Sequence, residues 1–77
     1  MTKVKVLIPT MDDVKAFVNI INHYQYDFDL VSGKYVIDAK SIMGIFSLDI
    51  SVPIDLIIHT EDDTSALLKD IDQYLVK

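Results

Sequence analysis

Apolar residues recur at every second position in three stretches of the chain, the spacing typical of β-strands that bury one face. The three sets are Val4, Val6 and Ile8; Phe28 and Leu30; and Ile54, Leu56 and Ile58. Ser32-Gly33 supplies a turn after the second set, so Tyr35-Val36-Ile37 is predicted to return as the other strand of a hairpin. The polar residues of these strands are expected on the opposite, solvated face; they are Lys3, Lys5, Asp27, Asp29, Asp55 and His59.

A helical spacing of apolar residues predicts two longer helices. Their apolar faces consist of Val14, Phe17, Val18 and Ile21 in the first, and of Leu67, Leu68, Ile71, Tyr74 and Leu75 in the second. Thr10 follows Pro9 and is the expected N-cap of the first helix, which should end near Asn22-His23. The segment from Thr60 to Asp63 carries cap candidates and negative charge, so the last helix is expected to start there.

A shorter apolar run, from Ile42 to Phe46, follows the hairpin. It is too short for a long helix and too apolar for a plain loop, so a short helix capped by Ser41 is expected. The order of elements is then strand, helix, strand, strand, short helix, strand, helix. We predict an α+β fold for a single domain, residues 1–77. It is an open-faced sandwich, a four-stranded antiparallel sheet with two long helices and one short helix on one face.

The charged residues exclude several classes of function. The chain has eleven Asp, one Glu, seven Lys and no arginine, for a formal net charge of −5. Nucleic-acid binding requires a basic surface, and bidentate capture of phosphate is mainly the chemistry of arginine, so no nucleic acid is expected as a partner. The absence of cysteine excludes disulfides and a thiol nucleophile. Because no signal peptide or membrane-spanning run is found, we expect a cytoplasmic protein with no membrane partner.

The segment from Ala39 to Leu48 reads A-K-S-I-M-G-I-F-S-L. This run resembles HPr, the small phosphocarrier of the bacterial phosphoenolpyruvate-dependent sugar phosphotransferase system. The resemblance extends to the length and the order of elements from end to end, and Ser32-Gly33-Lys34 falls where the family carries a G-K hairpin turn. It implies the HPr-like form of the sandwich fold.

The resemblance also implies a site at the start of the first helix, where the family carries the motif H-A-R-P. Its histidine accepts a phosphoryl group from enzyme I and passes it to sugar-specific enzymes. Matched without gaps, Thr10 stands at the histidine and Asp12 at the arginine, with Met11 and Asp13 at the other two positions. A hydroxyl replaces the nucleophilic ring nitrogen, and a carboxylate reverses the charge that would stabilise the transferring group. We therefore predict no catalytic residue, no cofactor and no metal site.

Ser41 matches the serine that a dedicated kinase phosphorylates in many members of the family, and it is equally suited to a plain N-cap. The apolar residues that follow cannot all point inward from one short helix. In the family, residues matching Met43 and Phe46 help form the apolar patch that meets enzyme I and other partners. The resemblance therefore implies a partner-binding surface, which we predict is formed by Ile42, Met43, Ile45, Phe46 and Leu48. The alternative is that these residues complete the core.

The function predicted from the sequence is an HPr-like protein of the phosphotransferase system that acts by protein binding or regulation. Its expected partners are enzyme I, an HPr kinase or a catabolite-control regulator, and the chain itself is expected to be a monomer without intrinsic catalysis. Two alternatives stay open. One is a working phosphocarrier with an unusual acceptor such as His23, and the other is a structural module that forms a homodimer through the Met43–Phe46 surface.

Overall fold

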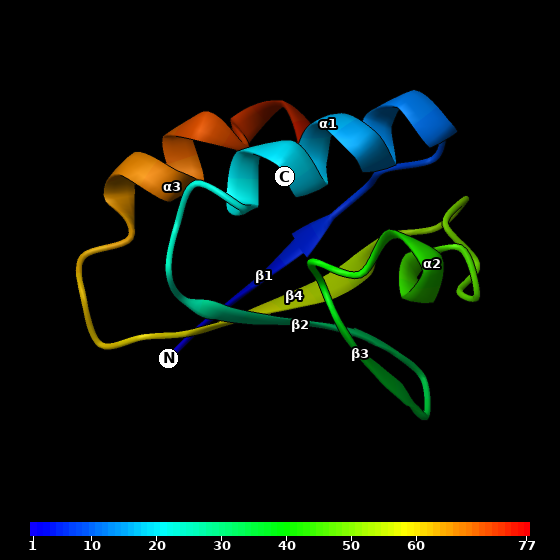
Figure 1. Ribbon diagram of the computed structural model, residues 1–77, viewed down its shortest axis with the longest axis horizontal. Coiled ribbons are helices and arrows are strands. Elements are labelled where there is room, and N and C mark those ends of the chain that lie inside the picture. The colour runs from blue at the N-terminus through cyan, green and yellow to red at the C-terminus, as the bar shows by residue number, and fades with distance from the viewer.

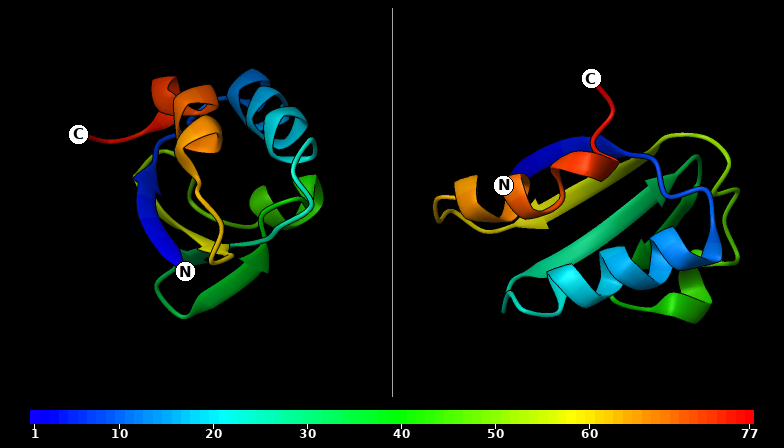
Figure 2. Two further views of the ribbon diagram at one scale, coloured as in Figure 1. Left: turned by 90° about the vertical axis from the view of Figure 1, so that its left-hand side faces the viewer. Right: turned by 90° about the horizontal axis from the view of Figure 1, so that it is seen from above.

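The computed structural model describes residues 1–77, which form one layer of helices over one sheet (Figure 1). The elements are β1 (Thr2–Val6), α1 (Met11–Ile21), β2 (Asp27–Ser32), β3 (Tyr35–Asp38), α2 (Ile42–Ile45), β4 (Ile54–His59), α3 (Ser65–Asp70) and a final 3₁₀ turn (Asp72–Tyr74). The strand order is β1-β4-β2-β3, and every neighbouring pair is antiparallel. The predicted α+β sandwich is confirmed, with α1 and α3 side by side over the sheet and α2 beside β3 (Figure 2).

One hydrophobic core lies between the helices and the sheet, and no polar side chain is buried in it. The alternating residues of β2 and β4 meet there, since Leu30 is opposite Leu56 and Phe28 is opposite Ile58. From α1, the predicted apolar face of Val14, Phe17, Val18 and Ile21 is buried in full. The Phe17 ring contacts Tyr74 edge-to-face, with 5.9 Å between ring centroids. The two ends of the chain therefore share one core.

The first helix begins and ends as its sequence predicts. Thr10 has an extended backbone, and its Oγ1 accepts a hydrogen bond from the Asp13 N–H at 3.1 Å. Both Asp12 and Asp13 lie in the first turn, where the helix dipole stabilises negative charge. Asn22 is the C-cap. Because Pro9 precedes the cap and cannot continue a strand ladder, the chain leaves β1 and enters α1 within a few residues.

The predicted hairpin turn depends on a single glycine. Ser32 of β2 is opposite Tyr35 of β3, so the loop consists of Gly33 and Lys34 alone. Gly33 has φ +60°, the value that a type II′ turn requires at its first central position and that glycine adopts without steric cost. No other residue of the chain has a positive φ. The register of β2 against β3 is fixed by this turn.

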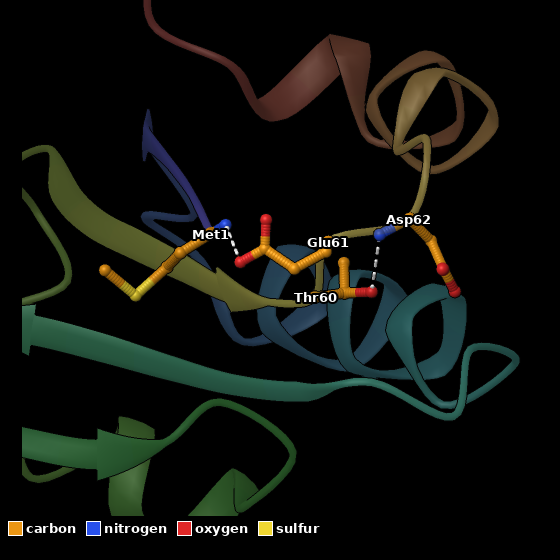
Figure 3. A network of polar contacts seen from close by, with 4 residues as sticks. All are labelled: Met1, Thr60, Glu61 and Asp62. Carbon is orange, nitrogen blue, oxygen red and sulfur yellow. Dashed lines mark hydrogen bonds and ion pairs between the residues drawn. The ribbon is translucent and has the colours of Figure 1, made fainter.

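The last helix differs from the prediction in its start and its length. It begins at Ser65, not within residues 60–63, and gives way to the 3₁₀ turn after Asp70. Thr60 Oγ1 accepts from the Asp62 N–H at 3.0 Å (Figure 3). Asp63 Oδ1 accepts from the Ser65 N–H at 2.9 Å. The first hydrogen bond closes a turn within the loop, and the second joins the loop to the first residue of α3. Glu61 of the loop also pairs with the Met1 ammonium group at 3.2 Å. The cap-like residues therefore shape the loop before the helix.

The C-terminal segment lies along the outer edge of β1. The Leu7 N–H donates to the Tyr74 carbonyl at 2.8 Å, and the Val76 N–H donates to the Lys5 carbonyl at 2.9 Å. Val6 forms an isolated antiparallel bridge with Leu75 between them. The later half of the β1 edge is thus hydrogen-bonded on both sides.

No helix of the chain has the length and hydrophobicity needed to cross a membrane.

The opposite face of the sheet carries the predicted polar residues and is open to solvent. Lys5 Nζ lies 2.9 Å from Asp55 Oδ1, and Lys3 Nζ lies 3.6 Å from Asp55 Oδ2. The hydrogen bond from Lys5 and the positive charges of both lysines lower the pKa of the Asp55 carboxyl. Asp55 of β4 therefore partly neutralises the charges of Lys3 and Lys5 of β1. We call this side of the sheet the outer face.

Candidate functional site

The start of α1 carries a hydroxyl and carboxylates in place of a nucleophilic imidazole. Thr10 and Asp12 are exposed, and Asp13 is half-buried. The Thr10 hydroxyl occupies the Asp13 N–H, one of the free amides at the helix start, so it serves as a structural cap. The negative side chains of Asp12 and Asp13 in the same turn repel an incoming phosphate group. The local chemistry of this turn is that of a capped helix.

Both histidines lie at the other end of the molecule. Val6, near the start of α1, is opposite Ile54 at the beginning of β4, whereas His59 is at the far end of that strand. His59 Nε2 lies 2.8 Å from Asp29 Oδ2. His23 follows the end of α1, and its Nδ1 lies 2.8 Å from the Asn19 carbonyl oxygen. Neither imidazole can reach the start of α1.

The short helix α2 is capped by Ser41, as predicted. Ser41 Oγ accepts a hydrogen bond from the Gly44 N–H at 3.1 Å, which satisfies one of the free amides at the helix start. A Cβ atom at position 44 would lie 3.1 Å from the same Oγ, tighter than ordinary van der Waals contact. Glycine at 44 therefore lets the helix backbone approach its own cap. The Ser41 side chain is half-buried.

The structure divides the predicted partner-binding residues into two groups. Met43 has 83% of its surface exposed, and Ile42 and Phe46 are also exposed. Ile45 and Leu48, in contrast, belong to the buried core, so their assignment to the binding surface is corrected. A helix of one turn directs only one side to the sheet, and Ile45 is on that side. We call the exposed group of Ile42, Met43 and Phe46 the α2 patch.

Met11 is a surface residue that the sequence analysis does not single out. It is the first residue of α1, and 57% of its surface is exposed. The beginning of α1 and the whole of α2 lie at the same end of the molecule (Figures 1 and 2). Its spacing of three residues from Val14 continues the apolar stripe of α1, so periodicity gives no signal of its exposure. A second methionine is therefore exposed at the end that carries the α2 patch.

Two shallow hollows lie elsewhere on the surface. One, of about 520 Å³, is lined by Asp27, Phe28, Asp29, Asp38, Lys40 and His59. The other, of about 550 Å³, is lined by Ile20, His23, Tyr24 and Asp70. In the second, the Tyr24 hydroxyl donates to Asp70, and this hydrogen bond raises the pKa of the tyrosine. No three His, Asp or Glu side chains are grouped so as to hold a metal ion.

Comparison with known proteins adds one finding about the fold. The chain is similar to a solved structure, HPr-C-His from Thermoanaerobacter tengcongensis, with a TM-score of 0.77 and 24% sequence identity. The match covers 95% of this chain and 89% of the other. A scan against protein-family models and a search of curated proteins give no match. The fold is therefore HPr-like, in agreement with the resemblance of residues 39–48.

Proposed function

We propose that this chain is an HPr-like binding protein of the bacterial phosphotransferase system, and that it acts in the cytoplasm without carrying phosphate on a histidine. Its partner would be enzyme I, an HPr kinase or a catabolite-control regulator. The observation that carries the proposal is the α2 patch, an exposed methionine and phenylalanine surface next to a helix start that has no imidazole.

The composition of the patch supports protein binding. Methionine adapts its shape to a partner surface, and phenylalanine supplies a large apolar contact area, so both are favoured at interfaces. Met43 has no place in the core, and its exposure costs solubility without any gain in packing. Met11 extends the apolar surface toward the start of α1. An apolar patch of this kind at one end of a small domain is typical of a docking surface.

The start of α1 supports the loss of phosphotransfer. A threonine hydroxyl without a neighbouring base is a poor nucleophile near neutral pH, and Thr10 Oγ1 has only a backbone amide as its partner. Asp12 places negative charge where a cationic group would stabilise the transferring phosphate. The helix itself still begins at the expected place, with Thr10 as its N-cap. Binding can therefore persist after the transfer chemistry is lost.

Ser41 gives the proposal a route for regulation. Its oxygen already lies at the start of α2, within hydrogen-bond distance of the Gly44 amide. A phosphate on this oxygen would keep that acceptor role and add negative charge beside the α2 patch. Such a modification would change the affinity of the patch for a charged partner. In the unmodified chain, Ser41 is the N-cap of α2.

Titration of the purified chain with purified enzyme I tests the proposal. We expect binding, no phosphohistidine after addition of phosphoenolpyruvate, and affinity about tenfold or more weaker for Met43→Asp, because a charge replaces an apolar anchor. Val76→Asp is the matched control, since Val76 is exposed but lies near the C-terminus, and it should bind like the wild type.

Two results contradict the proposal. An acid-labile phosphate mapped to His23 or His59 would establish a working carrier. Equal affinity of Met43→Asp and Val76→Asp would exclude the α2 patch as the binding surface. If enzyme I does not bind, the same titration with an HPr kinase and with a catabolite-control regulator decides the matter, and failure of all three rejects the proposal.

A further inference from the structure

Strand β3 forms an exposed edge of the sheet. It is last in the strand order and pairs only with β2. Tyr35 and Val36 have 67% and 62% of their surface exposed, and Asp38 is also exposed. Figure 2 shows α2 beside β3 on the helix side of the sheet, and no further strand pairs with β3 on its free side. The other edge of the sheet differs, because the C-terminal segment is hydrogen-bonded to β1 there.

The hairpin register shows which backbone groups of β3 are free. Antiparallel pairs alternate between residues that exchange hydrogen bonds and residues that do not. The two-residue turn closes on Ser32 and Tyr35, and the Ala39 N–H donates to the Phe28 carbonyl at 2.9 Å, so the odd-numbered residues of β3 face β2. The N–H and C=O of Val36 and the N–H of Asp38 therefore point away from the sheet.

A second copy of the same strand matches these groups when it runs antiparallel. With a twofold axis at Val36, the two Val36 residues exchange both hydrogen bonds of a closely spaced pair. Lys34 is then opposite Asp38 of the second copy, and Asp38 is opposite Lys34 of the second copy. Opposite charges in this arrangement stabilise a strand pair.

Within one chain, these two charged residues are not neutralised. Neither Lys34 nor Asp38 takes part in any of the ion pairs. One oxygen of Asp38 accepts from the Lys40 N–H at 2.9 Å, which leaves the other oxygen free. Asp38 is also opposite Asp29 of β2, so two carboxylates are cross-strand neighbours. A lysine from a second copy would relieve this repulsion.

Apolar residues line the same axis. Val31 of β2 is opposite Val36, and both belong to the outer face. The twofold pair therefore creates a row of four valines across two sheets, Val31 and Val36 from each copy. Cross-strand pairs of β-branched residues stabilise a sheet. The hydrogen bonds, the charges and the apolar row all agree with one register.

We propose that β3 pairs with β3 of a second copy, antiparallel about Val36, to form a continuous eight-stranded sheet. Only a four-residue strand takes part, so the contact is small and the dimer is weak, with a Kd on the order of 0.1–1 mM. The monomer expected from the sequence is then the main species at low concentration. The α2 patch is not part of this contact, and the inference does not depend on the proposed function.

Sedimentation of charge-reversed chains tests the register. The mass of the wild type should rise with concentration from 8.7 kDa toward twice that value. Lys34→Asp and Asp38→Lys place like charges opposite each other, so each alone should associate about tenfold more weakly. An equimolar mixture of the two variants restores both charge pairs and should associate like the wild type. This recovery requires that both variants are folded and that residues 34 and 38 face each other.

Amide signals and a second variant complete the test. In NMR spectra at rising concentration, the amide signals of Val36 and Asp38 should shift, and those of Ile42 and Met43 should not. Met43→Asp should dimerise like the wild type, which separates this contact from association through the α2 patch. A wild type that stays monomeric at millimolar concentration, or a mixture that gains no mass over its two components, overturns the proposal.

Discussion

Asp55 is a single residue whose surroundings predict how stability depends on pH. The hydrogen bond from Lys5 and the charges of Lys3 and Lys5 lower its pKa in the folded chain. Hydrogen bonds from Ser51 and Ser65 likewise lower the pKa values of Asp49 and Asp63. A carboxyl whose folded pKa is lowered stabilises the fold above its unfolded pKa, and this contribution is lost as pH falls through the folded value.

We therefore expect the contribution of these three carboxyls to the free energy of unfolding to be constant between pH 7 and pH 5. Below about pH 4 this contribution should decrease, and the free energy of unfolding with it. Asp55→Asn should make the fall shallower, because one of the responding carboxyls is gone. Urea unfolding at several pH values measures this. Asp27→Asn removes a carboxylate without an ion pair and serves as the control. Asp49 and Asp63 are exposed, and half-buried Asp55 pairs with lysines that are themselves exposed, so the effect of Asp55→Asn should be small and should shrink in high salt.

Which of the apolar residues near α2 face the solvent could not be predicted from their order. A helix of one turn has too few residues to fix a periodicity, so Ile45 and Met43 carry equivalent signals in the sequence. The Ser41 cap and the packing of Ile45 under the helix decide the orientation. The resemblance to HPr favoured Met43 and Phe46, and the structure exposes both.

At the scale of elements, a threonine precedes both α1 and α3, but only one of the two caps its helix with a side-chain hydrogen bond. Thr10 accepts from the Asp13 N–H, whereas Thr64, the residue before α3, makes no side-chain cap hydrogen bond. Both are small polar residues before an apolar stripe, so the sequence alone treats them alike. Their backbones differ, because Thr10 is extended and Thr64 is not.

Thr10→Ala should lower the free energy of unfolding by about 1 kcal/mol, since an amide at the start of α1 loses its acceptor. Thr64→Ala is the matched control and should change the free energy by less than about 0.5 kcal/mol. Chemical denaturation of both variants gives the comparison. Equal losses would mean that the Oγ1 hydrogen bond of Thr10 contributes nothing to stability.

The end of the chain shows what periodicity predicts and what it does not. Leu67, Ile71 and Tyr74 are buried as the apolar stripe requires. The stripe does not distinguish an α-helix from a shorter one followed by a 3₁₀ turn, because both place these residues on one side. Asp63, one of the expected cap residues, lies before the helix and accepts a hydrogen bond from the N–H of Ser65, the first residue of α3. Because loop residues form these local hydrogen bonds, α3 begins at Ser65, later than the start predicted within residues 60–63.

At the scale of the whole molecule, the alternation of apolar residues in the strands was sufficient to predict the sheet. Three of the four strands have an apolar residue at every second position, and these residues form the centre of the core. Two helices packed on the apolar side of the sheet bury the apolar faces of both layers. The surface carries no such constraint, so the binding role of the α2 patch stays a prediction.

Buried and exposed apolar residues should therefore differ sharply in their effect on stability. Leu56, at the centre of β4, is fully buried, and Leu56→Ala should lower the free energy of unfolding by about 2–5 kcal/mol. Met43→Ala, on the α2 patch, should change it by less than about 0.5 kcal/mol. Thermal and urea unfolding of the two variants test this contrast. A large loss for Met43→Ala would mean that the methionine supports the fold.

The C-terminal segment along β1 limits how far copies of the chain can join. A sheet with two open edges can add strands without end, and such growth leads to fibres. Here Tyr74 and Val76 occupy the later half of one edge. Two copies joined at β3 would present a β1 edge at either side, and the later half of each is already hydrogen-bonded to its own C-terminal segment. We therefore expect the tail to leave fewer backbone groups free for further strand addition than an uncovered edge would.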